Sequence, residues 1–286
     1  KPLEGADGQE CPDVFQIGDT WYLIGGDHYL SAKNPRGPYT RPAWSVIDRP
    51  GVYAGKRMFD GKRHIWTGWA WDTSTLRDCD NMIWGGDQCL PREVYPGPDG
   101  QLFCKPAEEV EKAIINVTDA VSETIPEEAA KVGETGKIIA RYSTPADYMF
   151  TCTFTVDVPQ TEIAFRMREQ APGGRAYRFA VLPAAKQATF SGENINRTDN
   201  NVAVDTTKPV TVRGFVLGSL IECFINDHYA FTRRAYNLHS GALSIEVQNG
   251  AVTLQSMRIG TPAPEKLAFD DTGFVPLFNG TDLTGW

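Results

Sequence analysis

One carboxylate in this sequence is set apart by its neighbours. Glu10 is followed by Cys11 and Pro12, and residues 13–24 then form a short, aromatic, alternating pattern that predicts a β-strand. A general acid must hold its proton near neutral pH, and a poorly solvating setting favours that. Cys11 and Pro12 solvate poorly, and Pro12 fixes the backbone at the entrance to the strand. Glu10 is therefore a candidate catalytic acid.

Other common catalytic and cofactor patterns are missing from the sequence. The histidines have no H-x-x-x-H spacing, the cysteines have no C-x-x-C spacing, and neither a phosphate loop nor G-x-S-x-G occurs. We therefore predict no metal and no organic cofactor. The formal charge of −8, without a cluster of Lys and Arg among aromatics, argues against a nucleic-acid partner. No apolar run reaches the ~20 residues of a membrane helix, so we predict no membrane partner.

The rest of the chain predicts an all-β fold. Apolar side chains at every second position indicate half-buried strands, and four segments show this pattern. Their apolar residues are Phe150, Cys152, Phe154, Val156 and Val158; Tyr177, Phe179 and Val181; Ile221, Cys223 and Ile225; and Leu243, Ile245 and Val247. Residues 107–112 alone predict a short helix. Of the six cysteines, Cys79–Cys89 and Cys89–Cys104 are conceivable disulfides, and buried free thiols are an equal alternative.

A change of composition near residues 107–116 predicts a domain boundary. Tryptophan and glycine are frequent before it, which suits propeller blades, and longer Thr- and Val-rich strands follow, which suit a sandwich. The Pro-rich segment 261–266 predicts a linker. We expect blades over residues 1–112, a β-sandwich over 113–260, and a linker with the first strand of a further domain over 261–286.

Several motifs together resemble glycoside hydrolase family 32, the invertase, inulinase and levanase group. They are E-C-P-D at 10–13, a Y-A following residues 46–52, D-G-K-R-H-I-W-T-G-W at 60–69, L-P-R-E-V at 90–94 and D-G-Q-L at 99–102. Weaker similarity continues through S-L-I-E-C-F-I-N-D at 219–227. Residues 273–286 resemble the opening strand of a 3-keto-disaccharide hydrolase or family-16-like domain. The resemblance implies the last two blades of a five-bladed propeller followed by a β-sandwich.

The same resemblance implies roles for particular residues. Glu10 matches the general acid/base of a retaining β-fructosidase, and Cys11, Tyr53 and Trp69 would contact the substrate. Tyr53 could instead be a packed aromatic beside the channel, and Trp69 could belong to the core. In the L-P-R-E segment we expect Arg92 and Glu93 to form an internal ion pair.

The resemblance also predicts that part of the active site is encoded elsewhere. The family's nucleophile lies in W-x-N-D-P-x-G and its transition-state stabiliser in R-D-P, and neither motif occurs here. We therefore expect a fragment that is inactive alone, from a secreted or periplasmic enzyme acting on sucrose, levan, inulin or a related glycan. The alternatives are a degenerate, carbohydrate-binding propeller and a related glycosidase acting on arabinosides, against which L-P-R-E-V argues.

Overall fold

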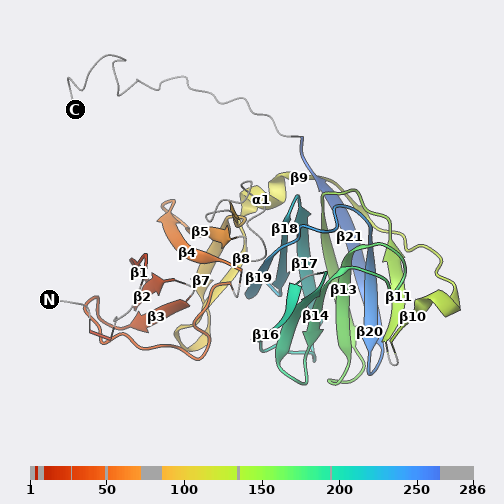
Figure 1. Cartoon of the computed structure of the whole chain (residues 1–286). Helices are drawn as coiled ribbons and strands as arrows, with labels where there is room; N and C mark the ends of the chain where they lie inside the picture. Colours follow the sequence, from red (N-terminus) through yellow and green to blue (C-terminus); the bar gives the residue numbers. More distant parts are fainter. Residues whose placement is uncertain are drawn as a thin grey trace, which may run out of the picture.

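A computed structural model describes residues 4–5, 10–26, 28–48, 51–71, 86–133, 136–193 and 195–264. Nearly all regular structure in these residues is β-strand, so the predicted all-β class is confirmed (Figure 1). Trp84, Cys79 and the tail over 265–286 lie outside the described residues. No helix in the described part of the chain is long and apolar enough to cross a membrane.

The N-terminal part contains two small antiparallel sheets. The first has the order β1 (Asp13–Ile17), β2 (Thr20–Gly25) and β3 (His28–Ala32). The second has the order β4 (Tyr53–Phe59), β5 (His64–Trp71), β7 (Arg92–Pro96) and β8 (Leu102–Pro106), with β6 (Gly86–Gln88) paired to β5 and the 3-10 turn η2 (Pro98–Gly100) between β7 and β8. These sheets form the partial propeller. That they are the last two of five blades stays a prediction.

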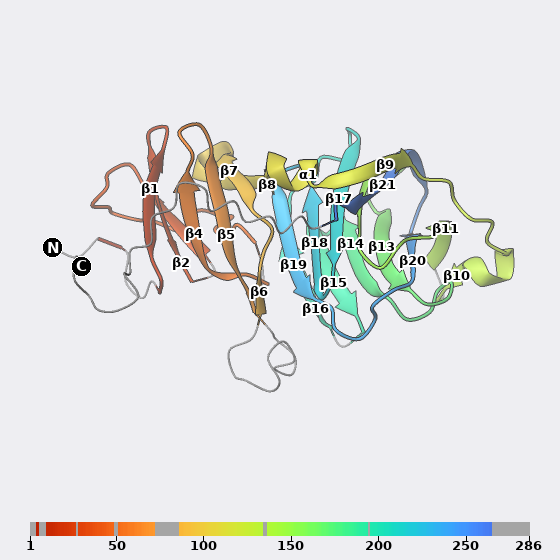
Figure 2. The same ribbon diagram turned by 90° about the horizontal axis from the view of Figure 1, so that it is seen from above.

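A short helix, α1 (Glu108–Lys112), connects the two parts where the sequence predicts it (Figure 2). Three acidic residues lie in its first turn and Lys112 in its last, the distribution that the helix dipole favours. Lys112 pairs with Glu108 one turn away at 2.6 Å. The helix follows β8 of the second sheet and leads directly into the sandwich.

The C-terminal part is a sandwich of two antiparallel sheets. One sheet has the order β10 (Lys131–Val132), β11 (Gly136–Tyr142), β20 (Ala242–Gln248), β13 (Glu162–Glu169), β14 (Tyr177–Leu182), β15 (Gln187–Gly192) and β16 (Ile195–Asn201). The other has the order β19 (Tyr229–Arg234), β18 (Leu220–Ile225), β17 (Val210–Leu217), β12 (Tyr148–Val156), β21 (Val252–Pro262) and β9 (Ile114–Asp119). A 3-10 turn, η3 (Glu127–Ala130), precedes β10.

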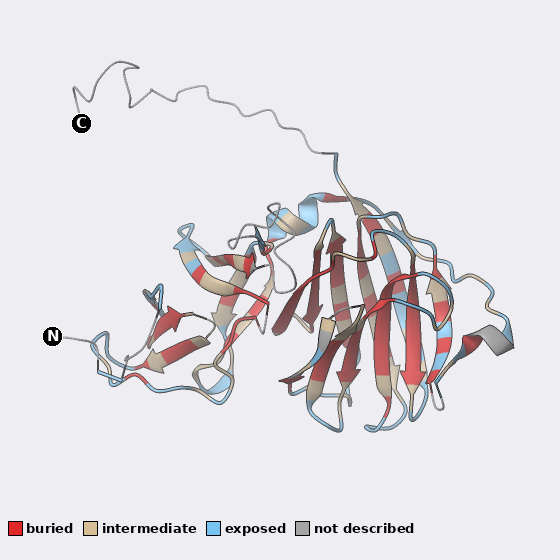
Figure 3. Cartoon of the chain, in the orientation of Figure 1, coloured by how far each residue is buried: buried red, intermediate tan, exposed pale blue. Residues whose placement is uncertain are grey.

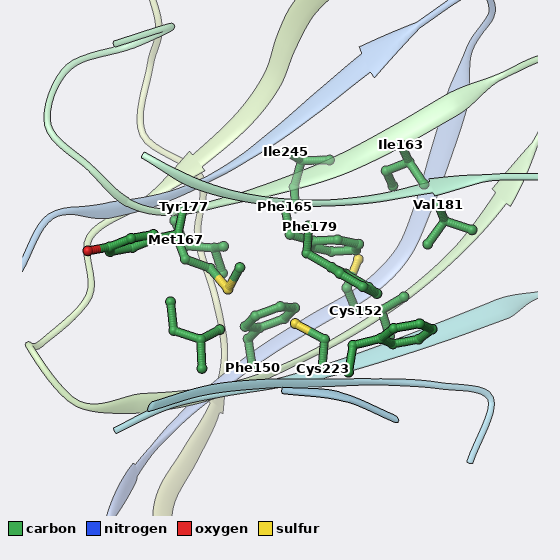
Figure 4. Packing of buried hydrophobic residues seen from close by; sticks show 14 of the residues in the cluster. Phe150, Cys152, Ile163, Phe165, Met167, Tyr177, Phe179, Val181, Cys223 and Ile245 are labelled. Atoms are coloured by element: carbon green, nitrogen blue, oxygen red, sulfur yellow. The ribbon is translucent and has the colours of Figure 1, made fainter. Parts of the chain in front are cut away.

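The sandwich core lies between these sheets and is built from the predicted alternating residues. Phe150 of β12 stacks on Phe165 of β13, with ring centroids 5.2 Å apart (Figure 4). Cys152 and Cys223 are fully buried free thiols in the same cluster. Val158 is an exception to the predicted pattern, because β12 ends at Val156 and leaves it 40% exposed. All five cysteines in the described residues are free, so Cys89–Cys104 is not a disulfide.

A second hydrophobic cluster joins the propeller part to the sandwich. It combines Trp66 and Val94 from the second sheet with Phe215, Phe224 and Ala230 from the six-stranded sheet. The six-stranded sheet is therefore buried on both faces near this junction, as the red strands there indicate (Figure 3). We retain the domain boundary at 112/113 as a proposal, supported by the place of α1 between β8 and β9; at the other end, β21 continues to Pro262, two residues beyond the expected limit of the sandwich.

Candidate active site

The segment around Glu10 lies at the entrance to β1. Glu10 precedes the first residue of the strand, Asp13, and is exposed together with Cys11 and Pro12, so the expected poorly solvating setting is wrong. Its backbone carbonyl accepts a hydrogen bond from the N–H of Gly26 at 2.8 Å, and the carbonyl of Gly26 accepts one from the N–H of Ala54 at 3.0 Å. Glu10 is thus held against the turn between β2 and β3, and that turn is held against β4.

Tyr53, the first residue of β4, contacts the carboxylate directly. Its hydroxyl donates a hydrogen bond to Oε2 of Glu10. Gly26 permits this approach, because its φ is +59° and a β-carbon there would lie 3.2 Å from the Tyr53 ring. A carboxylate whose Oε2 accepts this bond has Oε1 left to carry a proton. The structure therefore brings together two of the residues that the sequence singles out.

Residues of β4 also fasten the segment that follows Glu10. The Lys56 ammonium donates to the backbone carbonyls of Cys11 at 2.6 Å and of Pro12 at 3.1 Å. The backbone N–H of Arg57 donates to the Asp13 carboxylate at 2.7 Å. Cys11 is exposed and has a φ of +49°, a conformation that these bonds help to hold. Lys56 could not be predicted as part of the site, because a lysine that donates only to backbone carbonyls leaves no motif.

Trp69 on β5 is the cross-strand partner of Tyr53. Directly paired residues of an antiparallel sheet project on the same face, so Trp69 lies on the face that carries Tyr53. Its indole is partly buried. Gly86 lies against it, and a β-carbon at Gly86 would be 2.4 Å from the indole Nε1. By contrast, Trp66 is 3% exposed and belongs to the cluster at the junction.

Beneath this face, Arg92 forms a buried ionic cluster. Its guanidinium donates to the carboxylates of Asp48 and Glu222, and all three side chains are at most 1% exposed. Thr232 donates to Asp48 through both its hydroxyl and its backbone N–H, and the N–H of Leu90 donates to Glu222 at 2.7 Å. Burial raises the pKa of Glu222, and Arg92 opposes that rise.

The predicted pair of Arg92 with Glu93 is wrong. Glu93 follows Arg92 directly in β7, so the two side chains project to opposite faces of the strand. Arg92 points into the junction, whereas Glu93 points outward and pairs with Lys105 at 3.3 Å. Arg92 does form an internal ion pair, but its partners are far away in sequence. Asp48 stands in the tripeptide D-R-P at 48–50, which belongs to no motif used above, and residues 49–50 lie outside the described residues.

The described residues contain no group of three His, Cys, Asp or Glu side chains arranged to hold a metal ion. His28 lines a small cavity with Gly26, Asp48 and Trp66, between the turn that holds Glu10 and the Arg92 cluster. The face of Tyr53 and Trp69 presents a carboxylate, a phenol and an indole. Such a set can donate and accept a proton beside an apolar ring surface.

Comparison with known proteins confirms the resemblance to family 32 glycoside hydrolases. No family model matches the chain. In sequence, the chain is similar to the insoluble isoenzyme 7 of β-fructofuranosidase from Oryza sativa subsp. indica. The identity is 31% over an alignment of 118 residues, and the match covers 37% of this chain and 20% of that protein. The matched segment thus spans about a fifth of the relative's length.

Solved structures share the fold over most of this chain. The exo-inulinase from Aspergillus awamori aligns with a TM-score of 0.66 and 16% identity, covering 92% of this chain and 59% of its own. A glycoside hydrolase family 32 protein from Bifidobacterium adolescentis aligns with a TM-score of 0.64 and 17% identity, covering 89% of this chain and 41% of its own. The propeller-plus-sandwich architecture is therefore confirmed.

Proposed function

We propose that the protein to which this chain belongs hydrolyses β-fructosides with retention of configuration, and that Glu10 is its general acid/base. The observation that carries the proposal is the hydrogen bond from Tyr53 to Glu10, beside Trp69 on one open face. The similarity to β-fructofuranosidase supports the substrate class. The substrates that we propose are fructosides of the sucrose, levan or inulin type.

In the first step, a carboxylate nucleophile attacks the anomeric carbon of the fructosyl unit while Glu10 donates its proton to the departing glycosidic oxygen. The products are a covalent fructosyl–enzyme and a free alcohol. In the second step, Glu10, now ionised, removes a proton from water as the water displaces the nucleophile. Tyr53 positions Glu10 in both steps, since its hydroxyl fixes one carboxylate oxygen and leaves the other toward the reacting bond.

The substrate-binding roles of Cys11 and Trp69 are part of this proposal. Trp69 offers an apolar surface to the C–H face of a furanose ring, next to the groups that exchange protons. Cys11 lies beside Glu10 on a segment that Lys56 holds in place. The sequence lacks both W-x-N-D-P-x-G and R-D-P. We therefore also propose that these 286 residues alone do not turn over substrate. Secretion of the protein, or its export to the periplasm, stays a prediction.

The test replaces Glu10 by Gln in the complete protein. We expect kcat on sucrose to fall at least ~100-fold with little change in KM, because general acid–base catalysis supplies about 10²–10⁴-fold. For a fructoside with a good leaving group, the rate of the first step should fall much less, because such a leaving group departs without being protonated. Glu127→Gln, at an exposed position of η3, is the matched control. Unchanged turnover in Glu10→Gln would remove Glu10 from the mechanism.

A further inference from the structure

The strand β4, which lies beside β1 (Figure 2), contacts the Glu10 segment through more than Tyr53. Lys56, on the same strand, donates to the backbone carbonyls of Cys11 at 2.6 Å and of Pro12 at 3.1 Å. These carbonyls belong to the two residues that directly follow Glu10. The Lys56 ammonium therefore acts on the main chain at the base of the candidate acid/base.

A β-bulge in β4 places Lys56 on the same face as Tyr53. In a regular strand, residues three apart project to opposite faces. The cross-strand partners of Tyr53 and Lys56 are Trp69 and Thr67, which are two apart on β5 and therefore share a face. The register shifts between Tyr53 and Lys56, where Ala54 has a φ of +52°. The bulge thus aims both side chains at one segment, a use that bulges commonly have beside active sites.

The segment that Lys56 holds is strained. Cys11 has a φ of +49°, in the left-handed region, which costs free energy for a residue with a β-carbon. Successive carbonyls of an extended strand point in opposite directions, whereas those of Cys11 and Pro12 both meet one ammonium. A strained conformation persists only where its surroundings fix it, and such strain gathers at functional sites. Lys56 is the side chain that fixes both of these carbonyls.

The other bonds of this segment lie on either side of the turn that Lys56 holds. Before it, the carbonyl of Glu10 accepts from the N–H of Gly26 at 2.8 Å. After it, the carboxylate of Asp13 accepts from the N–H of Arg57 at 2.7 Å. The turn between these two anchors depends on the bonds from Lys56, which are strengthened by its charge. Loss of the ammonium would leave the main chain next to Glu10 free to rotate.

We propose that Lys56 is a positioning residue of the active site. Its ammonium holds the turn at Cys11 and Pro12 and thereby keeps the Glu10 carboxylate in the orientation that transfers a proton. This inference rests on the proposed function, because it requires Glu10 to be the acid/base. Tyr53 fixes the head of the Glu10 side chain, and Lys56 fixes the main chain from which that side chain projects.

The first test follows hydrogen exchange of backbone amides in the ¹⁵N-labelled 286-residue chain. The amide of Gly26 reports on the segment, because it donates to the carbonyl of Glu10. We expect this amide to exchange at least ~5-fold faster in Lys56→Met, because local opening becomes easier. Lys56→Arg keeps the charge and the donors and should recover most of the protection. Lys62→Met, at an exposed position on the turn between β4 and β5, is the matched control.

The second test measures turnover of sucrose by the complete protein. Lys56→Met should lower kcat about tenfold with little change in KM, because a misplaced acid/base is felt mainly in the transition state. In the Glu10→Gln background, the same substitution should cause no further loss, because a residue that acts only through Glu10 has nothing left to position. Lys56→Arg should retain most of kcat, and Lys62→Met should retain all of it.

Three results would overturn the proposal. The first is unchanged exchange of the Gly26 amide in Lys56→Met. The second is an equal acceleration at the amide of Tyr29, which donates to the carbonyl of Ser45 at 2.7 Å, because that would be a general loss of stability. The third is a kcat that Lys56→Met leaves unchanged, or a loss that adds in full to that of Glu10→Gln. The proposed hydrolysis fails by a different result, unchanged turnover in Glu10→Gln alone, so the two failures are distinguishable.

Discussion

The hydroxyl of Tyr53 donates a hydrogen bond to the carboxylate of Glu10, although 43 positions separate the two residues in the sequence. The bond joins the start of β4 to the entrance of β1. Two neighbouring sheets of the propeller thus meet at the one carboxylate that the sequence singles out. The bond fixes one carboxylate oxygen, and its removal should affect catalysis more than folding.

Tyr53→Phe in the complete protein should lower kcat on sucrose about tenfold and change KM little. The reason is that a freely rotating carboxylate spends less time aligned with the glycosidic oxygen, a loss felt mainly in the transition state. Steady-state kinetics and a thermal melt measure the two effects. Tyr95→Phe is the control, because its hydroxyl bonds to the carbonyl of Asp227 at the junction with the sandwich. Equal losses of kcat in both variants would contradict the positioning role.

Trp69→Ala should raise KM for a fructo-oligosaccharide about tenfold, whereas Trp69→Phe should retain most of the affinity. An aromatic surface against a sugar ring is worth on the order of 1 kcal/mol, which corresponds to this change. Quenching of tryptophan fluorescence by the oligosaccharide gives a second measure of binding in the protein without substitutions. Phe59→Ala, at a 52% exposed position on β4, is the control. If Trp69→Ala and Phe59→Ala behave alike, Trp69 does not contact the substrate.

Arg92→Met should destabilise the 286-residue chain by about 3–5 kcal/mol, because it leaves the carboxylates of Asp48 and Glu222 buried without a partner. Urea unfolding measures the loss. Arg175→Met removes an arginine that is 64% exposed and paired with Glu193, and it should leave the midpoint almost unchanged. The triple variant Arg92→Met, Asp48→Asn, Glu222→Gln should recover part of the lost stability. A mild effect of Arg92→Met alone would mean that water reaches the cluster.

The pH dependence of stability should include a contribution from Asp60. The backbone N–H groups of Arg63 and Lys62 and the Arg63 guanidinium lower the pKa of Asp60 to about 2, below its ordinary value of 3.8. The folded state therefore favours the ionised form. This contribution is fully present above pH 3.8 and is lost as the pH falls through about 2.

Asp60→Asn should accordingly lower the urea midpoint at pH 6, and the difference from the parent chain should vanish near pH 2. Asp119→Asn, whose side chain is 92% exposed and lies 3.9 Å from Arg258, is the control. A difference between Asp60→Asn and the parent that stays constant across this range would show that the effect does not come from ionisation.

The strands of the sandwich could be predicted from the sequence because each follows one local pattern, the alternation of apolar and polar residues. Alternation of buried and exposed positions places Phe150, Cys152 and Phe154 in the core, and the structure leaves each of them fully buried. The rule fails at Val158 because it does not register where a strand ends. It also cannot show that both faces of β18 are buried, Cys223 on the side of the sandwich core and Phe224 on the side of the junction.

The contacts of the candidate site could be predicted only in part. Glu10 and Tyr53 are recognisable because their motifs resemble those of a known family. The bond from Lys56 to the carbonyl of Cys11 and the partners of Arg92 depend on how distant segments pack, and Glu222 lies 130 positions from Arg92. Side-chain direction within β7 nevertheless excludes a pair between Arg92 and Glu93, so strand geometry alone could have corrected that expectation.

The cluster at the junction limits how this protein can be recombined with its relatives. Trp66 and Val94 on one side fill the same core as Phe224 and Ala230 on the other. A chimera that exchanges the sandwich at α1 would cut through this core even though it cuts the chain only once, in a short helix without buried residues. The exchanged sandwich must bring its own counterparts of Glu222, Thr232 and Phe224. The natural unit of exchange is therefore the sandwich together with the second sheet.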